Sequence, residues 1–280
     1  MDNKKVWFIT GASKGIGLSL VKALLAQNYA VAATSRTIQF LKEQVGEKAN
    51  FLSLEVNLVD EASVKDAINK TIDHFGGIDV VVNNAGYGQL GTIEELTDEE
   101  TRKNFDVNVF GSLNVIRNVM PFMRMKKSGH IINISSIAGF TGEYSGVGIY
   151  CATKFAVAGF TEALSAEAKE FGISVTVVYP GVFRTNFLEQ DSIGLPKNPI
   201  AEYTEGRKVE SFHLNELNGN QQGNPEKAAV ALIKITETAN PPLHLFLGSD
   251  AFKQAQEKIE ELKKALNDNE SLSRSTDFQL

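Results

Sequence analysis

Apolar runs of strand length alternate with helix-like segments along almost the whole chain, and this alternation limits the possible folds more than any other feature. The runs occur at residues 6–10, 30–35, 51–56, 78–82, 130–134, 173–179 and 243–247. Alternation of this kind is typical of a parallel sheet with helices on both faces. We therefore predict an α/β fold with a doubly wound sheet of seven parallel strands.

Length, charge and cysteine content narrow the class further. The 280 residues can form one large core, so we expect a single domain over residues 1–280. Acidic residues outnumber basic ones by 34 to 28, and no basic run exceeds two lysines, so we expect no nucleic-acid partner. No apolar stretch approaches a membrane span and no secretory leader precedes the first strand, which favours the cytoplasm. The single cysteine and four scattered histidines predict no metal site.

A glycine-rich turn joins the first strand to the first helix. Gly11, Gly15 and Gly17 follow the run at 6–10, and apolar residues at helical spacing come next. In this position one glycine permits a tight turn, a second lets backbone amides approach a pyrophosphate, and a third allows close helix packing. The helix N-terminus adds a positive dipole. The motif predicts a dinucleotide site of Rossmann type, and a turn that binds no ligand is the alternative.

The second strand ends where this fold holds the adenosine ribose. A carboxylate there would bind both ribose hydroxyls and repel a 2′-phosphate, but the residues present are Ser35 and Arg36. The guanidinium of Arg36 suits a phosphate, and Lys14 in the glycine turn adds a second cation. We therefore predict NADP(H) as the cofactor. The alternative is that Arg36 is only a solvated residue at a strand end.

Polar motifs follow three further strands. Asn-Asn-Ala-Gly at 83–86, a serine pair at 135–136 and Pro-Gly at 180–181 each come directly after an apolar run. Ligands bind at the carboxyl ends of strands in open parallel sheets, so these motifs are candidate site residues. Asn108 stands inside a helix that a capping box is expected to start at residue 97, and its apolar neighbours indicate burial with a defined partner.

Tyr150 and Lys154 lie four residues apart, and therefore on one face if their segment is helical. A cation beside a phenol favours the phenolate and lowers the phenol pKa, so the pair is a candidate proton donor. Tyr144 is a rival phenol, but Gly148 stands where its lysine would be. Tyr-x-x-x-Lys alone is a weak pattern, and its weight comes from the motifs that precede it.

These motifs, in this order, resemble the short-chain dehydrogenase/reductase family over residues 4–250. The matching motifs are Thr10-Gly11-x-x-x-Gly15-Ile16-Gly17, Asn83-Asn84-Ala85-Gly86, Asn108, Ser136, Tyr150-x-x-x-Lys154 and Pro180-Gly181. The resemblance implies that Tyr150 is the general acid toward a ketone or aldehyde oxygen, and the base in reverse. Lys154 would tune that phenol and bind the nicotinamide ribose. Ser136 would hydrogen-bond the carbonyl oxygen, and Asn108 would hold a water that links Lys154 to solvent.

The resemblance also implies a cofactor-binding set, in which groups at 84–86 and 180–182, with Thr185, position the nicotinamide end. The set is Gly11, Ser13, Lys14, Gly15, Ile16, Gly17, Arg36, Asn57, Leu58, Asn84, Ala85, Gly86, Tyr150, Lys154, Pro180, Gly181, Val182 and Thr185. Two positions depart from the family pattern. Ser136 stands 14 residues before Tyr150, one more than the commonest spacing, and the loop 139–148 can absorb the difference. Asn57 stands where an aspartate often faces the adenine, and its amide oxygen can accept the same hydrogen bond.

Residues 187–224 interrupt the alternation with a segment that is rich in Gly, Pro and Asn but still carries apolar side chains. The resemblance favours a lid over a substrate pocket, and a surface excursion packed on its own domain is the alternative. An amphipathic helix and a polar tail are expected over residues 249–280.

Motifs and resemblance together imply an NADP(H)-dependent oxidoreductase that interconverts a ketone or aldehyde and the corresponding alcohol. The apolar lid suits a small-molecule substrate that is uncharged or lipophilic. The resemblance also implies a homodimer or homotetramer, with the helices around Asn108 and after Tyr150 as candidate interfaces. The alternative is a cofactor-binding regulatory or scaffold protein that has the fold without turnover.

Overall fold

Seven parallel strands form the central sheet, in the order β3-β2-β1-β4-β6-β7-β9. The computed structural model describes residues 4–189 and 192–278. Residues 190–191 of the expected lid, 279–280 of the expected tail, and 1–3 lie outside the described residues. The strands are β1 Val6–Ile9, β2 Ala30–Ser35, β3 Phe51–Glu55, β4 Val80–Asn83, β6 Gly129–Ile134, β7 Ile173–Pro180 and β9 His244–Leu247. The predicted doubly wound α/β fold is confirmed.

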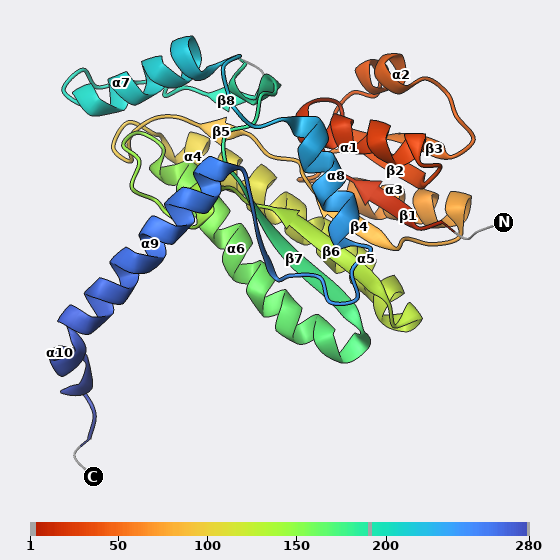
Figure 1. Cartoon of the computed structure of the whole chain (residues 1–280). Coiled ribbons are helices and arrows are strands. Elements are labelled where there is room, and N and C mark those ends of the chain that lie inside the picture. Colours follow the sequence, from red (N-terminus) through yellow and green to blue (C-terminus); the bar gives the residue numbers. More distant parts are fainter. Residues whose placement is uncertain (1–3, 190–191, 279–280) are drawn as a thin grey trace.

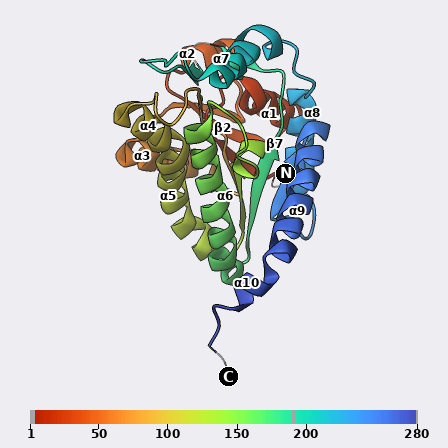
Figure 2. The same cartoon turned by 90° about the vertical axis from the view of Figure 1, so that its left-hand side faces the viewer.

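Helices cover both faces of this sheet (Figure 1). The α-helices of the described residues are α1 Gly15–Ala26, α2 Gln39–Val45, α3 Glu61–Phe75, α4 Asp98–Phe105, α5 Gly111–Lys126, α6 Gly148–Ala168, α7 Thr204–Ser211, α8 Pro225–Ile235, α9 Ser249–Asp268 and α10 Glu270–Arg274. α1 and α8 pack on one face, and α3, α5 and α6 pack on the other (Figure 2). Within the described ranges, no helix combines the length and the apolar character of a bilayer span.

Alternate side chains of each strand build two separate cores. Trp7 and Ile9 of β1 pack with the α1 and α8 side, whereas Phe8 between them packs with the α3 and α5 side. All three are fully buried. Successive side chains of a strand point to opposite faces, and helices cover both faces here. The strands therefore need continuous apolar runs, which is why those runs were visible in the sequence.

Side-chain caps fix where helices begin. Thr97 and Glu100 form the capping box predicted for α4, and the Thr97 hydroxyl accepts from the Glu100 amide at 3.2 Å. Asn224 caps α8 by accepting from the Glu226 amide at 2.8 Å. Pro225 fills the first position of α8, where no amide hydrogen is needed. These residues are therefore explained by helix initiation.

Three local features differ from the sequence-based expectations. A π-helical turn, η1 Asp106–Phe110, separates α4 from α5 in the helix that was expected to be uniform. β4 begins at Val80 instead of 78, and Asp79 instead binds the backbone of Val6 through its carboxylate at 2.7 Å. In the expected lid, β8 Ile193–Gly194 pairs with β5 Gly88–Gln89 in a second, two-stranded sheet. A strand of two residues is too short to show the alternation of side chains from which strands are predicted, so β5 and β8 were not expected.

The C-terminal helix projects away from the sheet. α9 starts beside the carboxyl edge of the sheet, extends outward and is followed by α10 (Figures 1 and 2). The polar tail expected from Asn267 therefore contains one further exposed helical turn. Because all seven strands are parallel, the turns that follow them lie at a single edge of the sheet, and the predicted motifs collect there.

Candidate functional site

Two turns meet at the centre of the carboxyl edge, one after β1 and one after β4. The Asn84 side-chain amide donates to the carbonyl oxygens of Thr10 and Gly11 at 3.0 and 2.9 Å. The Thr10 hydroxyl accepts from the backbone amides of Asn84 and Ala85, both at 3.1 Å. The strand order reverses between β1 and β4, and such a switch point is where open α/β sheets bind ligands.

The three predicted glycines are required by different contacts. Gly11 has a φ of +62°, and a Cβ on it would lie 2.7 Å from the Ala85 Cα. A Cβ on Gly17 would lie 2.6 Å from the Asn84 side-chain nitrogen. Gly15 has a φ of +59° and faces Thr185, whose Cβ would be 3.4 Å away from an added Cβ. Gly11 and Gly17 thus let the two turns approach closely, while the approach of Gly15 to a pyrophosphate stays a prediction.

The N-terminus of α1 opens toward the same edge. Lys14 is its N-cap residue and makes no capping hydrogen bond with its side chain. The backbone amides of residues 15–17 have no partner within the described part of the chain. Open amides and the positive helix dipole together favour an anion. This is one feature that fits the phosphates of a dinucleotide.

Two cations flank this helix end. The Ala12 amide donates to the Thr34 carbonyl at 2.9 Å, which ties the stretch containing Ser13 and Lys14 to the end of β2. Arg36 follows β2 and is exposed. Neither the Lys14 nor the Arg36 side chain has a hydrogen bond or ion pair to any of the residues that the structure describes. Both charges remain available for a phosphate group.

Tyr150 and Lys154 lie one turn apart on α6, and the Ser136 hydroxyl lies near enough to the phenol to lower its pKa. The Lys154 Nζ lies 5.8 Å from the centre of the Tyr150 ring and donates to the Ile134 carbonyl at 3.0 Å. Gly86 stands beside the lysine, because a Cβ on it would lie 3.4 Å from Nζ. The structure therefore brings the predicted residues after β4 and β6 together with α6.

Burial changes the proton affinity of both α6 groups. Lys154 is 4% exposed, and burial lowers its pKa to about 8. Burial raises the pKa of Tyr150 above its ordinary value of 10.0, and the hydrogen bond with Ser136 offsets only part of the change. The predicted lowering of the phenol pKa is therefore wrong for this structure, because the loss of water around a phenolate dominates. At neutral pH Tyr150 keeps its proton.

The two neighbouring serines have different partners. The buried Ser135 hydroxyl donates to the Lys154 carbonyl at 2.7 Å, and a Cβ on Gly139 would lie 2.3 Å from that hydroxyl. The Ser136 hydroxyl accepts from the Ala138 amide at 3.1 Å and also reaches Tyr150. Ser135 thus holds α6 to the end of β6, and Ser136 is the serine that contacts the phenol.

Asn108 lies in the π-helical turn and is 1% exposed. Its amide nitrogen donates to the Tyr87 carbonyl at 3.0 Å and to the Thr153 hydroxyl at 3.1 Å, and its oxygen accepts from the Tyr87 amide at 3.0 Å. The predicted burial with defined partners is confirmed. The side chain joins the segment after Gly86 to the residue before Lys154. Its role in holding a water stays a prediction.

Asn57 and Leu58 follow β3 in a turn that uses some of their polar groups. The Asn57 side-chain oxygen accepts from the Val59 amide at 3.2 Å, and the Leu58 carbonyl accepts from the Asn114 side chain at 2.8 Å. An amide oxygen has two lone pairs, so one remains on Asn57. Contact of Asn57 with an adenine stays a prediction.

The turn after β7 is held by its neighbours. The Gly181 amide donates to the Leu247 carbonyl at 2.8 Å, and the Val182 amide donates to an Asp250 carboxylate oxygen at 2.7 Å. The Val182 carbonyl accepts from the Gly223 amide at 3.0 Å. The Val182 amide therefore has a protein partner and is not open to a nicotinamide carboxamide, whereas the Val182 carbonyl oxygen keeps a second lone pair.

Tyr150 packs in an apolar cluster, and its ring centre lies 6.0 Å from that of Phe187. The buried members of the cluster are Leu90, Ala138, Val147, Cys151, Leu188 and Ile193. Leu214 and Leu217 pack against it. Residues of the 187–224 segment thus form part of an uncharged wall beside the phenol.

Two buried carboxylates attach this segment to the rest of the chain. Glu95 accepts from the Ile200 amide at 2.7 Å and pairs with Arg207 at 2.9 Å. Burial alone would raise the pKa of Glu95, but its hydrogen bonds and the Arg207 charge hold that pKa below the ordinary value. Glu100 accepts from the Lys197 amide at 2.9 Å. The segment therefore packs firmly on its own domain as well as beside Tyr150.

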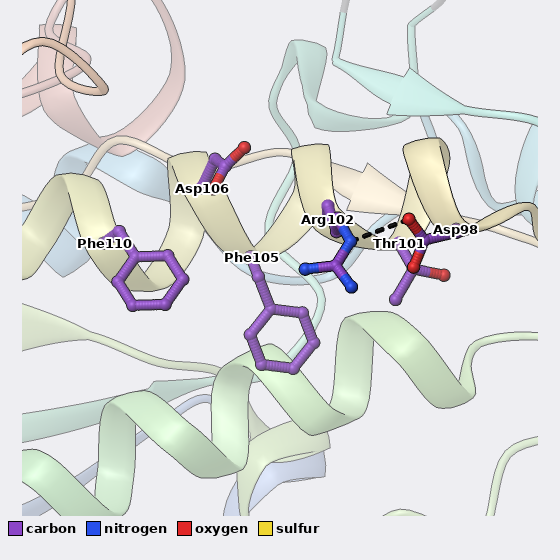
Figure 3. A pocket seen from close by; sticks show the side chains of 6 residues that line it. All are labelled: Asp98, Thr101, Arg102, Phe105, Asp106 and Phe110. Atoms are coloured by element: carbon purple, nitrogen blue, oxygen red, sulfur yellow. Dashed lines mark hydrogen bonds and ion pairs between the residues drawn. The ribbon is translucent and has the colours of Figure 1, made fainter.

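A groove of about 350 Å³ lies along α4 and η1 (Figure 3). Its lining residues are Asp98, Thr101, Arg102, Phe105, Asp106 and Phe110. Figure 3 shows the Phe105 and Phe110 rings on one side of the helix and Asp106 on the other. None of these residues belongs to the predicted site. Over the described ranges, no group of three or more His, Cys, Asp or Glu side chains is arranged to hold a metal ion.

Four supporting residues were absent from the predicted set, namely Thr10, Tyr87, Thr153 and Asp250. Thr10 stood in the glycine motif, but its hydroxyl contact with the turn after β4 has no sequence signal. Tyr87 and Thr153 are neighbours of predicted residues and act through Asn108. Asp250 follows the end of β9, and the rule that ligands gather at the carboxyl ends of strands would have singled it out.

Comparison with known proteins agrees with this geometry. The model of the family described as short chain dehydrogenase matches residues 5–194. A 3-ketodihydrosphingosine reductase of Bacteroides thetaiotaomicron is 36% identical over 247 residues, which cover 87% of this chain and 88% of that protein. A short-chain dehydrogenase from Streptomyces avermitilis is 32% identical, with a TM-score of 0.89 over 98% of this chain and 100% of that one. ElxO, solved with NADP bound, is 25% identical, with a TM-score of 0.73 over 89% of this chain and 99% of that one.

Replacement of Lys154 by methionine should flatten the pH dependence of stability above pH 8. Between a folded pKa of about 8 and an unfolded value of 10.5, the unfolded chain binds more protons at Lys154 than the folded one. The free energy of unfolding should therefore rise with pH in this window, by at most about 1.4 kcal/mol per unit, and Lys154→Met should lose that rise. Urea unfolding from pH 7.5 to 9.5 measures it. The exposed Lys264→Met serves as control, and equal slopes for both variants would contradict the burial argument.

Proposed function

The chain belongs to the short-chain dehydrogenase family, and on that premise we propose that it is an NADP(H)-dependent oxidoreductase that interconverts a ketone or aldehyde and the corresponding alcohol. It would act as a single catalytic domain on a small-molecule carbonyl or alcohol. Its place in the cytoplasm stays a prediction from the sequence.

The observation that carries the proposal is the arrangement of Tyr150 with Lys154 one turn away on α6 and with Ser136 near the phenol. The phenol is protonated at neutral pH, so it holds a proton that a carbonyl oxygen can take as that oxygen gains charge. The Ser136 hydroxyl, already in contact with the phenol, can donate a second hydrogen bond to the same oxygen. Proton donation suits the reducing direction.

The described residues fit a dinucleotide at the adjoining edge. The open amides of α1 can bind its diphosphate, and Arg36 with Lys14 can bind a 2′-phosphate. Lys154 stands where it can hold a ribose hydroxyl as well as influence the phenol. When bound, NADPH supplies the hydride, and these residues orient it against the carbonyl.

An uncharged or lipophilic substrate is favoured by the apolar cluster around Tyr150. The buried members of this cluster carry no charged side chain, so a charged substrate would lose water there without a partner. The relative from Bacteroides thetaiotaomicron is named as the reductase of a ketone, which supports the reaction class. Residues 187–224 would act as a lid over this wall.

Tyr150→Phe should reduce turnover by about 10² or more while leaving NADPH affinity nearly unchanged, because it removes only the transferable proton. Lys154→Ala should lower both the turnover and the NADPH affinity. Ser136→Ala should behave like Tyr150→Phe, whereas Ser135→Ala should chiefly lower stability, since Ser135 holds the Lys154 carbonyl. Stopped-flow assays over ketones, aldehydes and secondary alcohols, with titrations of NADPH, measure these effects. If NADPH binds but nothing is turned over and Tyr150→Phe changes nothing, a scaffold protein becomes the better explanation.

Arg36→Asp should reverse the cofactor preference. Arg36 offers a charge-assisted contact to a 2′-phosphate, and its loss plus the new repulsion should lower the NADPH to NADH ratio of kcat/KM by about 10². The exposed Arg274→Asp controls for the change in net charge. Equal efficiency with both cofactors in the unaltered protein would defeat the assignment to NADP(H).

The groove along α4 and η1 supports a homodimer or homotetramer that uses this helix. Phe110 is 50% exposed beside it, and aromatic side chains are enriched at protein interfaces. Phe110→Asp should shift the sedimentation coefficient toward the monomer. Met125→Asp, at an 80% exposed position of α5, should leave it unchanged. A monomeric unaltered protein would refute this part of the proposal.

A further inference from the structure

The first turn of α9 places one carboxylate directly on the turn after β7. An Asp250 oxygen, Oδ2, accepts from the Val182 amide at 2.7 Å. A Cβ on Gly181 would lie 2.1 Å from Oδ2, and a Cβ on Gly248 would lie 2.4 Å from the other oxygen, Oδ1. Glycines on both sides therefore form the slot that holds this carboxylate.

The contact is more specific than helix stabilisation requires. An aspartate in the first turn of a helix is favourable even when it faces water, because it complements the helix dipole. Gly248 is the N-cap of α9, and the side chain of Asp250 binds the Val182 amide, which lies outside its own helix. Its Oδ1 is buried and has no partner within the described residues. A buried acceptor left unpaired is costly, so the position of Asp250 calls for a reason beyond capping.

Two more residues on the same face of α9 hold the loop before α6. Gln254, one turn after Asp250, accepts from the Tyr144 hydroxyl, and Lys258, one turn further, pairs with Glu143 at 2.8 Å. Residues spaced by four lie on one side of a helix. The polar face of α9 thus contacts both the turn after β7 and the loop that leads to Tyr150.

We propose that Asp250 is a positioning residue for the nicotinamide end of the cofactor. It fixes the turn at 180–182 by taking the Val182 amide, while the next amide, that of Phe183, has no partner among the described residues. This inference rests on the proposed function, because it assumes that the turn after β7 meets the nicotinamide. Asp250 acts on that end through Val182, and the adenosine end, at α1 and β2, is held by other elements.

The test compares two ligands that share the adenosine end. NADPH carries a nicotinamide, whereas adenosine 2′,5′-bisphosphate lacks it. Calorimetric titration should show that Asp250→Ala weakens NADPH about tenfold, the scale of one charge-assisted hydrogen bond, while the bisphosphate changes less than about twofold. Asp250→Asn retains an acceptor oxygen for Val182 and should restore most of the NADPH affinity.

Controls make the outcomes distinct. Asp268→Ala removes an exposed carboxylate from the far end of the same helix and should affect neither ligand. If Asp250→Ala does not fold, Asp250→Ser provides the truncation, because serine is tolerated in a first turn. The inference would be overturned if Asp250→Ala lowered the affinity for both ligands equally, or did not lower the affinity for NADPH. It would also be overturned if Asp250→Asn bound NADPH as weakly as the truncated variant. An unaltered protein that binds neither ligand would overturn the proposed function itself.

Discussion

The contact between the turns after β1 and β4 is the interaction on which the site depends. Parallel strands place every following turn at one edge, but only direct bonds fix the turns relative to one another. Asn84 and Thr10 make four such bonds, and the absence of side chains at Gly11 and Gly17 lets them form. A dinucleotide that lies across this junction would therefore meet a surface set before it binds, which limits the entropy lost on binding.

Burial has opposite effects on the pKa values of Tyr150 and Lys154, which lie close together. Removing water disfavours the charged form of each, so the phenol holds its proton more tightly and the ammonium more loosely. Neighbouring residues have fixed dipoles that reduce the free energy lost when water is removed from these groups. Ile134 accepts from the lysine, and Ser136 contacts the phenol. Under the proposed function, groups held by fixed dipoles in this way would need little rearrangement during reaction, which is a principal source of rate enhancement.

Features that depend on local chemistry were predictable from the sequence, and features that depend on distant packing were not. Apolar runs revealed the strands, and the capping box at Thr97 revealed a helix start, because period and capping act over a few residues. The raised pKa of Tyr150 depends on how many groups exclude water from it, which spacing cannot show. The occupied amide of Val182 likewise depends on Asp250, which lies far along the chain.

The contact of Asp250 with Val182 also bears on the order in which the parts of the chain fold. β9 is the last strand of the large sheet in the chain and lies at its edge, paired only with β7. A chain that folds as it is synthesised can align β1, β4, β6 and α6 before β9 and Asp250 have emerged. Pairings between distant segments form slowly, since loop closure must precede them. The protein would then become able to hold the nicotinamide only in a late folding step. A bound cofactor would stabilise only the molecules that had completed that step.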